Sequence, residues 1–184
     1  MTSLSDVELI AEFRKGRTEG FNLLVARYRE KVYWVARRMM GNHEDADDIV
    51  QEVFLRVYES LNKFRAESGF YTWLYRITVN VSLNAIRKKR VKDFIKFEEI
   101  AETLVSEEDR TDSRILRQEY ETTLEKAIQR LPPKQKLVFI MKYYDEISFD
   151  EMAKMLNRSV GGLKANYFHA LQKIQKYVRS ELNK

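Results

Sequence analysis

Residues 64–90 read FRAESGFYTWLYRITVNVSLNAIRKKR and bring three kinds of side chain into one short helical segment. Aromatic residues come first, the amides of Asn80 and Asn84 follow, and a basic cluster closes the segment. Aromatic rings stack on unpaired bases, amides hydrogen-bond base edges and cations bind phosphate, so this pattern predicts binding to opened DNA or to RNA. The alternative interpretation is a buried core, because aromatic and aliphatic residues at this spacing, Trp73 and Ile77 among them, commonly face one.

The composition of the 184-residue chain favours an all-helical protein, since it has only 6 Gly and 2 Pro and its apolar residues recur at helical spacing. The absence of cysteine excludes disulfides and zinc–thiolate sites, and two histidines are too few to favour a histidine-built site. No glycine-rich phosphate loop or nucleophile elbow is present, which argues against an enzyme. A net charge of +5 is weak evidence for nucleic acid. Without a signal core or an apolar span, we expect a cytoplasmic protein that does not insert into membranes.

Upstream of the quoted segment, the sequence predicts three helices. Ser5 and Glu8 form a capping box for the first, which Gly16 ends, and the second runs from about Thr18 to Met40. The third begins near Glu44 and carries polar and acidic residues on one face: Asp45, Asp47, Asp48, Gln51, Glu52 and Arg56. Such a face is ordinarily a solvated helix surface, or less often a divalent-metal cluster.

The segment after this helix divides into a loop, a helix and a tether. Residues 62–69 lack helical periodicity and predict a loop, and the aromatic helix is expected to end at about Lys92. Residues 93–112 contain eight acidic and two basic residues, which is typical of a solvated linker. The sequence therefore predicts two small helical domains, 1–92 and 113–184, joined by an acidic linker at 93–112.

The second domain ends in a helix-turn-helix pattern. A helix over 116–131 is stopped by two prolines, and another follows over 134–144. Ser148 and Glu151 form a second capping box, Asn157 is suited to a left-handed turn, and Ser159 caps a last helix from Val160 to about Glu181. A local excess of basic residues after Lys154 favours a phosphate-facing unit. A generic pair of helices gives a similar pattern.

Three segments in this order resemble bacterial RNA polymerase sigma factors of the extracytoplasmic-function (ECF) group: DADDIVQEVFLRVYESLNKFR, FYTWLYRITVN and ISFDEMAKMLNRSVGGLKANYFHAL. The resemblance covers nearly the whole chain and implies that its two domains correspond to regions two and four of that family. It implies a non-catalytic polymerase subunit without cofactor or metal, monomeric when free. Its implied partners are the clamp helices of the largest polymerase subunit, the flap of the second-largest subunit, duplex promoter DNA, the non-template single strand and an anti-sigma factor.

The resemblance also assigns roles to residues of the first domain. The acidic face formed by Asp45, Asp47, Asp48, Gln51, Glu52 and Arg56 would bind core polymerase. The loop and the aromatic helix would melt and read the minus-ten element, with Phe64 lining a pocket for a flipped base and Asn80 hydrogen-bonding that base. Trp73 would stack at the upstream edge of the bubble, or belong to the core. The implied minus-ten residues are Asn62, Phe64, Arg65, Ser68, Tyr71, Trp73, Arg76, Asn80, Arg87, Lys88 and Arg90.

In the last helix, the resemblance implies a minus-thirty-five reader that enters the major groove. Its implied contact residues are Ser159, Gly162, Lys164, Ala165, Asn166, Phe168, His169 and Lys173, although His169 is equally well read as a plain surface residue. The chain departs here from the usual family pattern, because it lacks a threonine and two or three arginines. Each missing arginine removes a contact worth about 1–3 kcal/mol if bidentate, so we expect weaker binding or a preference for adenine through Asn166.

Three other functions remain open on the sequence alone. One is a stand-alone helix-turn-helix regulator, which would have to dimerise on a palindrome. Another is a metal-dependent nuclease built on Asp45, Asp47, Asp48 and Glu52. The third is a helical module that binds only other proteins.

Overall fold

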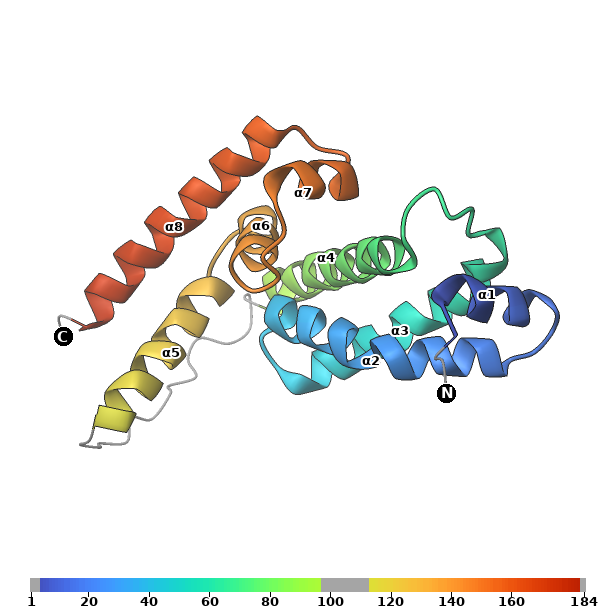
Figure 1. The fold of residues 1–184 in the computed structure, drawn as a ribbon. Coiled ribbons are helices and arrows are strands. Elements are labelled where there is room, and N and C mark those ends of the chain that lie inside the picture. The colour runs from blue at the N-terminus through green and yellow to red at the C-terminus, as the bar shows by residue number, and fades with distance from the viewer. Residues whose placement is uncertain (1–3, 97–112, 183–184) are drawn as a thin grey trace. The chain divides into compact units, whose positions relative to one another are not determined.

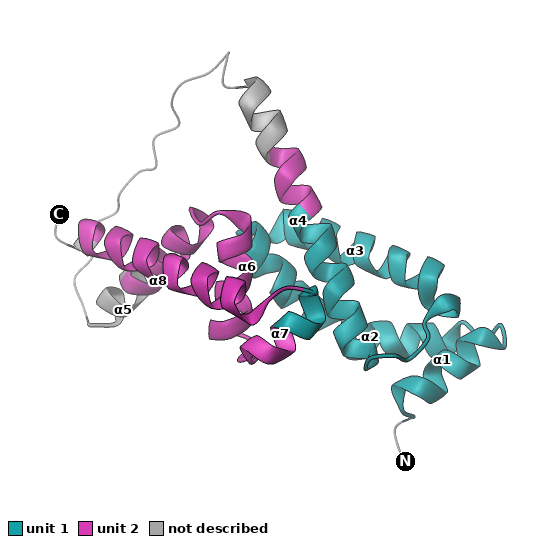
Figure 2. Cartoon of the chain, turned by 90° about the horizontal axis from the view of Figure 1, so that it is seen from above, with its two compact units in different colours: residues 1–83, 153–157 teal, residues 84–152, 158–184 magenta. Residues whose placement is uncertain are grey.

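The computed structural model describes residues 4–96 and 113–182, and within these ranges the chain is helical and contains no strand (Figure 1). The predicted all-helical fold is therefore confirmed. Two compact units are present (Figure 2): residues 1–83 with 153–157, and residues 84–152 with 158–184. Most of the acidic linker predicted at 93–112 lies outside the described residues.

The first unit is built from three helices, a short 3-10 turn and the start of a fourth helix. These are α1 (Asp6–Arg14), α2 (Glu19–Met40), α3 (His43–Ser60), η1 (Leu61–Lys63) and α4 (Phe70–Lys96). Local signals set the boundaries: the predicted Ser5–Glu8 capping box is present, and Gly41 ends α2 in the left-handed conformation with a φ of 89°. Helix α2 packs against both α1 and α3.

Buried apolar side chains recur at helical spacing along these helices and form the core. Leu24, Ala36 and Met39 of α2 and Val53 and Val57 of α3 are fully buried. Leu74 and Tyr75 of α4 are buried as well. A second set of contacts fixes α1: the Tyr28 hydroxyl donates to Asp6 at 2.6 Å, and burial together with this carboxylate raises the pKa of Tyr28 to about 12.

Helix α1 lies so close to α2 that the contact requires a glycine. A Cβ atom at Gly20 would overlap the carbonyl oxygen of Leu9 and lie 3.1 Å from the amide nitrogen of Phe13. Both are backbone atoms, which cannot move away without displacing the whole helix. Gly20 therefore sets the distance between α1 and α2.

We expect Gly20→Ala to lower the free energy of unfolding by about 1–3 kcal/mol, because overpacking outweighs the better helix propensity of alanine. The matched control is Gly161→Ala in the last helix, where a Cβ meets nothing within 4 Å. That variant should be unchanged or stabilised by up to about 1 kcal/mol. Urea unfolding followed by circular dichroism measures both, and equal stability of the two variants would show that α1 tolerates displacement.

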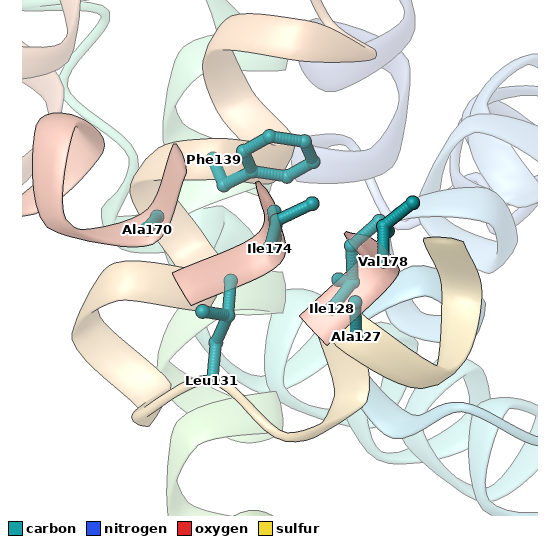
Figure 3. Close-up of a cluster of buried hydrophobic side chains, with 7 residues drawn as sticks. All are labelled: Ala127, Ile128, Leu131, Phe139, Ala170, Ile174 and Val178. Carbon is teal, nitrogen blue, oxygen red and sulfur yellow. The ribbon is translucent and has the colours of Figure 1, made fainter. Parts of the chain in front are cut away.

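The second unit contains the end of α4, then α5 (Ser113–Gln129), α6 (Pro133–Tyr143), the start of α7 (Phe149–Leu156) and α8 (Val160–Leu182). Pro133 occupies the first position of α6, where its missing N–H is no loss. Side chains from α5, α6, α8 and the turn between α5 and α6 form a buried cluster around Phe139 and Ile174 (Figure 3). The cluster consists of Ala127, Ile128, Leu131, Phe139, Ala170, Ile174 and Val178.

The structure corrects the sequence-based prediction at several helix ends. Helix α4 continues to Lys96 instead of ending near Lys92, so the first four residues of the predicted linker are helical. Helix α5 spans Ser113–Gln129 instead of 116–131, and its end precedes the prolines by a short turn. The start of the predicted 62–69 loop belongs to η1, a single turn stabilised by the bond from the Phe64 amide to the Leu61 carbonyl at 3.2 Å.

Candidate functional site

The outer face of α3 is acidic, as the sequence predicts. Asp47, Asp48 and Gln51 are exposed, and the Glu52 carboxylate accepts a bond from Arg56 at 2.7 Å. An exposed i,i+4 ion pair of this kind contributes little to stability. Breaking it therefore costs little, and both side chains are free to bind a partner instead. Leu55 lies on the same face and is 61% exposed. The sequence-based prediction does not include Leu55. Its position outside the buried apolar stripe of α3 would be sufficient to predict that its side chain is exposed.

Asp45 has a different surrounding from the rest of the acidic set. It is half-buried, its amide binds the Asn42 side chain at 2.8 Å, and its carboxylate accepts a bond from the Asn42 amide at 2.6 Å. Asn42 is the N-cap of α3, so Asp45 forms part of the helix start. Its carboxylate also lies in the first turn, where the helix dipole favours negative charge.

A groove of about 420 Å³ lies beside the acidic face, between α2 and α3. Polar side chains at its edge include Arg29 of α2 and Asp47 and Gln51 of α3, and its apolar lining is Val25, Val50 and Phe54. An apolar floor with charged edges is typical of a protein-binding surface. Arg29 was not predicted from the sequence, because its proximity to Asp47 depends on how α2 packs against α3.

The loop between η1 and α4 is mostly exposed and has one buried residue, Phe64. The Phe64 ring packs on Trp73 with a centroid distance of 5.0 Å and on Phe70 at 5.9 Å. Asn62 and Arg65 are exposed, Ser68 is half-buried, and Ala66 adopts a left-handed conformation with a φ of 56°. Because its ring packs on two aromatic partners, Phe64 belongs largely to the packing at the base of the loop, and its predicted role in lining a pocket for a flipped base stays a prediction.

Helix α4 presents an exposed polar stripe at helical spacing. Arg76, Asn80, Asn84 and Arg87 are exposed, as is Lys88 beside them, and Arg87 donates to the Asn84 side chain at 3.3 Å. Because Asn80 is exposed, its amide needs no partner within the fold and is accessible to a ligand. The side chain of Arg90 lies outside the described residues.

The aromatic residues at the start of α4 serve mainly as packing. Trp73 is half-buried against Phe64 and Phe70. Tyr71 is half-buried and stacks on Tyr28 at 5.8 Å, and the Lys31 ammonium lies 5.2 Å from its ring centroid. The core interpretation of the aromatic residues thus holds for much of the segment, and the polar stripe is its accessible part.

The helix-turn-helix elements form as predicted. The Ser148–Glu151 capping box starts α7, Asn157 turns with a φ of 51°, and the Ser159 hydroxyl accepts a bond from the Gly162 amide at 3.2 Å. A Cβ at Gly162 would approach this hydroxyl to 3.1 Å, so the glycine leaves room for the cap. The ring of Phe149 in α7 contacts Tyr167 of α8 at 5.8 Å.

Most of the predicted contact residues in and before α8 are exposed. The exposed ones are Ser159, Gly162, Lys164, Ala165, Phe168, His169 and Lys173. Phe168 is 57% exposed and packs edge-on against His169. Asn166 is half-buried, and its amide donates to the Gly162 carbonyl at 2.8 Å. This bond uses one of the two N–H donors of the Asn166 amide, so the second N–H and the Oδ1 atom remain for the predicted contact with adenine.

Within residues 4–96 and 113–182, no group of three or more His, Asp or Glu side chains is placed to hold a metal ion. In the same ranges, no helix has the length and apolar character needed to cross a membrane.

Comparison with known proteins identifies the family. The models of Sigma-70 region 2 and Sigma-70, region 4 match residues 24–91 and 122–174. The ECF RNA polymerase sigma factor SigW of Bacillus subtilis is 33% identical over 92% of this chain and 95% of the relative. Two solved structures share the fold: CnrH in complex with the cytosolic domain of CnrY, and the sigma factor RpoE in complex with the anti-sigma factor NepR from Bartonella quintana. The first is 22% identical with a TM-score of 0.65, and the match covers 95% of this chain and 97% of that chain. The second is 18% identical with a TM-score of 0.65, and the match covers 86% of this chain and 96% of that chain.

A helical unit with an acidic face and a polar stripe, followed by a helix-turn-helix, defines the sigma factor class, whose members are non-catalytic transcription initiation factors that act with core RNA polymerase on promoter DNA. Within that class, the chain belongs to the ECF sigma factors and directs polymerase to promoters.

Proposed function

We propose that this chain assembles with core polymerase through the acidic face of α3 and opens promoters by capturing the non-template strand on the polar stripe of α4. The observation that carries the proposal is the stripe itself, where Arg76, Asn80 and Arg87 are exposed along a helix that directly follows an exposed loop. Cations beside amides suit a strand whose phosphates and bases are both accessible.

The acidic face supports a basic helical partner, for which the clamp helices of the largest polymerase subunit are the proposed match. Asp47, Asp48 and Gln51 supply charge and hydrogen bonds, while Leu55 adds an apolar centre. Charge complementarity of this kind raises the association rate and fixes the orientation of the partners. The nuclease alternative would need the same carboxylates to gather around a cation, and Asp45 is already engaged by Asn42.

For the second domain, we propose that α8 reads the minus-thirty-five element and that the domain also contacts the flap of the second-largest subunit. Lys164 and Lys173 are exposed for phosphate contacts, and Phe168 is exposed for apolar contact with a thymine methyl group. Residues 1–92 and 113–184 are proposed to act as separate DNA-binding domains joined through the intervening segment. The free protein is proposed to be a cytoplasmic monomer without catalytic activity, controlled by an anti-sigma factor like the one bound to the Bartonella relative.

A direct test measures assembly and promoter retention in turn. Fluorescently labelled chain is titrated with core polymerase, and the complex is then challenged with heparin on a promoter fragment selected from a random library. We expect tight assembly and heparin-resistant retention only when the chain and core polymerase are both present. Retention of duplex DNA by a dimer of the free chain would instead support the stand-alone regulator.

A further inference from the structure

Helix α1 lies outside residues 24–91, the range matched to region two, and one of its side chains contacts the predicted specificity loop. The Arg14 guanidinium donates a hydrogen bond to the carbonyl oxygen of Phe64, fifty residues later in the chain. We propose that Arg14 is a positioning residue that fixes the conformation of the loop at 62–69 and thereby its choice of base. This inference rests on the proposed function of that loop.

The backbone of Arg14 is fixed by the packing of the residue before it. Phe13, the preceding residue, is buried and packs edge-on against Tyr58 of α3 with a centroid distance of 5.2 Å. It also contacts Phe21 of α2 at 5.9 Å. The end of α1 is therefore anchored to two helices, which gives the guanidinium a fixed starting point.

The contact anchors the loop at its buried end, and the exposed residues that follow have little other support. Phe64 is its one buried residue, and the ring and the carbonyl of Phe64 are held by different partners: Trp73 and Phe70 on one side, Arg14 on the other. The Arg65–Glu67 ion pair further along is 4.0 Å long and its side chains are 84% and 80% exposed, so it constrains the loop little.

The loop also contains a conformation that needs external support. Ala66 is in the left-handed region, which L-residues other than glycine seldom adopt unless the surrounding structure enforces it. Because Arg14 fixes the carbonyl two residues before Ala66, loss of this bond should let the loop sample other shapes. A loop with several shapes would still bind a strand, but it would discriminate less well between bases.

The test uses holoenzyme containing the full chain and a linear promoter library randomised at six minus-ten positions, with run-off transcripts sequenced to give the base preference at each position. We expect Arg14→Ala to reduce the strongest loop-dependent preference about tenfold, while affinity for core polymerase and the thermal midpoint change little. Arg14→Lys retains a donor and should restore most of the preference. Lys15→Ala is the matched control, because Lys15 is an adjacent cation paired with Glu12 at 2.9 Å.

An unchanged preference profile for Arg14→Ala would overturn the inference. An equal loss on every sequence, or a lower thermal midpoint with the profile intact, would overturn it too, because it would assign Arg14 a purely structural role. If Arg14→Ala does not fold, Arg14→Met keeps the aliphatic stem and gives the same readout. A wild-type chain without any minus-ten preference would refute the proposed function of the loop itself, and the inference would fall with it.

Discussion

Asp48→Arg is expected to weaken binding to core polymerase by about thirtyfold, equivalent to about 2 kcal/mol. Asp48 is exposed near the centre of the acidic face, between Glu44 and Glu52 on the same side of α3. Reversing its charge replaces the proposed attraction to a basic helix of the polymerase with repulsion at the same point. Because the side chain is exposed, the fold should be unaffected, and the loss should appear in the association rate as well as in the equilibrium.

Titration of labelled chain with core polymerase at two salt concentrations measures this effect. The control is Glu125→Arg, an equal change in charge at an exposed position on α5. Higher salt should shrink the difference between Asp48→Arg and wild type, since screening weakens exposed charge pairs. Wild-type affinity in Asp48→Arg would remove α3 from the polymerase interface.

Asn80→Ala is expected to reduce promoter opening about tenfold without changing affinity for core polymerase. The amide is exposed in the middle of the polar stripe, between Arg76 and Asn84, so its removal deletes the proposed base contact and leaves the core intact. A lost contact of this type corresponds to about 1.4 kcal/mol at a tenfold change. Flipping a base out of the stack already costs a few kcal/mol, so opening is sensitive to a loss of this size.

Open-complex formation, followed with a fluorescent base analogue in the minus-ten region, measures this step separately from assembly. The matched control is Asn22→Ala, an exposed amide on α2 away from the stripe. It should open promoters like wild type. Wild-type opening rates in Asn80→Ala would exclude this amide as the base reader.

Local signals in the sequence were sufficient to predict most of the fold. The capping boxes at Ser5–Glu8 and Ser148–Glu151, and the left-handed turn at Asn157, depend on residues a few positions apart, so the sequence defines them directly. The exposed face of α3 follows from helical periodicity for the same reason. The predicted end of α4 near Lys92 is wrong, because the acidic composition that begins at residue 93 does not stop the helix, which continues to Lys96.

Features that depend on distant contacts were not predictable in this way. Burial of Phe64 depends on ring contacts with Phe70 and Trp73 of α4 across the loop, and the bond from Arg14 joins residues fifty positions apart. Even over four residues, spacing does not reveal a side-chain bond: the Asn166 amide donates to the Gly162 carbonyl, and its predicted contact with DNA stays a prediction. An Asn side chain can bond either to a nearby backbone group or to a ligand, and the spacing of residues in the sequence does not show which of the two it binds.

Run-off transcription by core polymerase on a promoter library, with and without this chain, tests the central claim most directly. We predict transcripts that depend on the chain, whose start sites lie at a fixed distance from one enriched minus-ten element and one minus-thirty-five element. Transcription no higher than that of core polymerase alone, on every sequence in the library, would contradict the assignment of this chain as a promoter-recognition subunit.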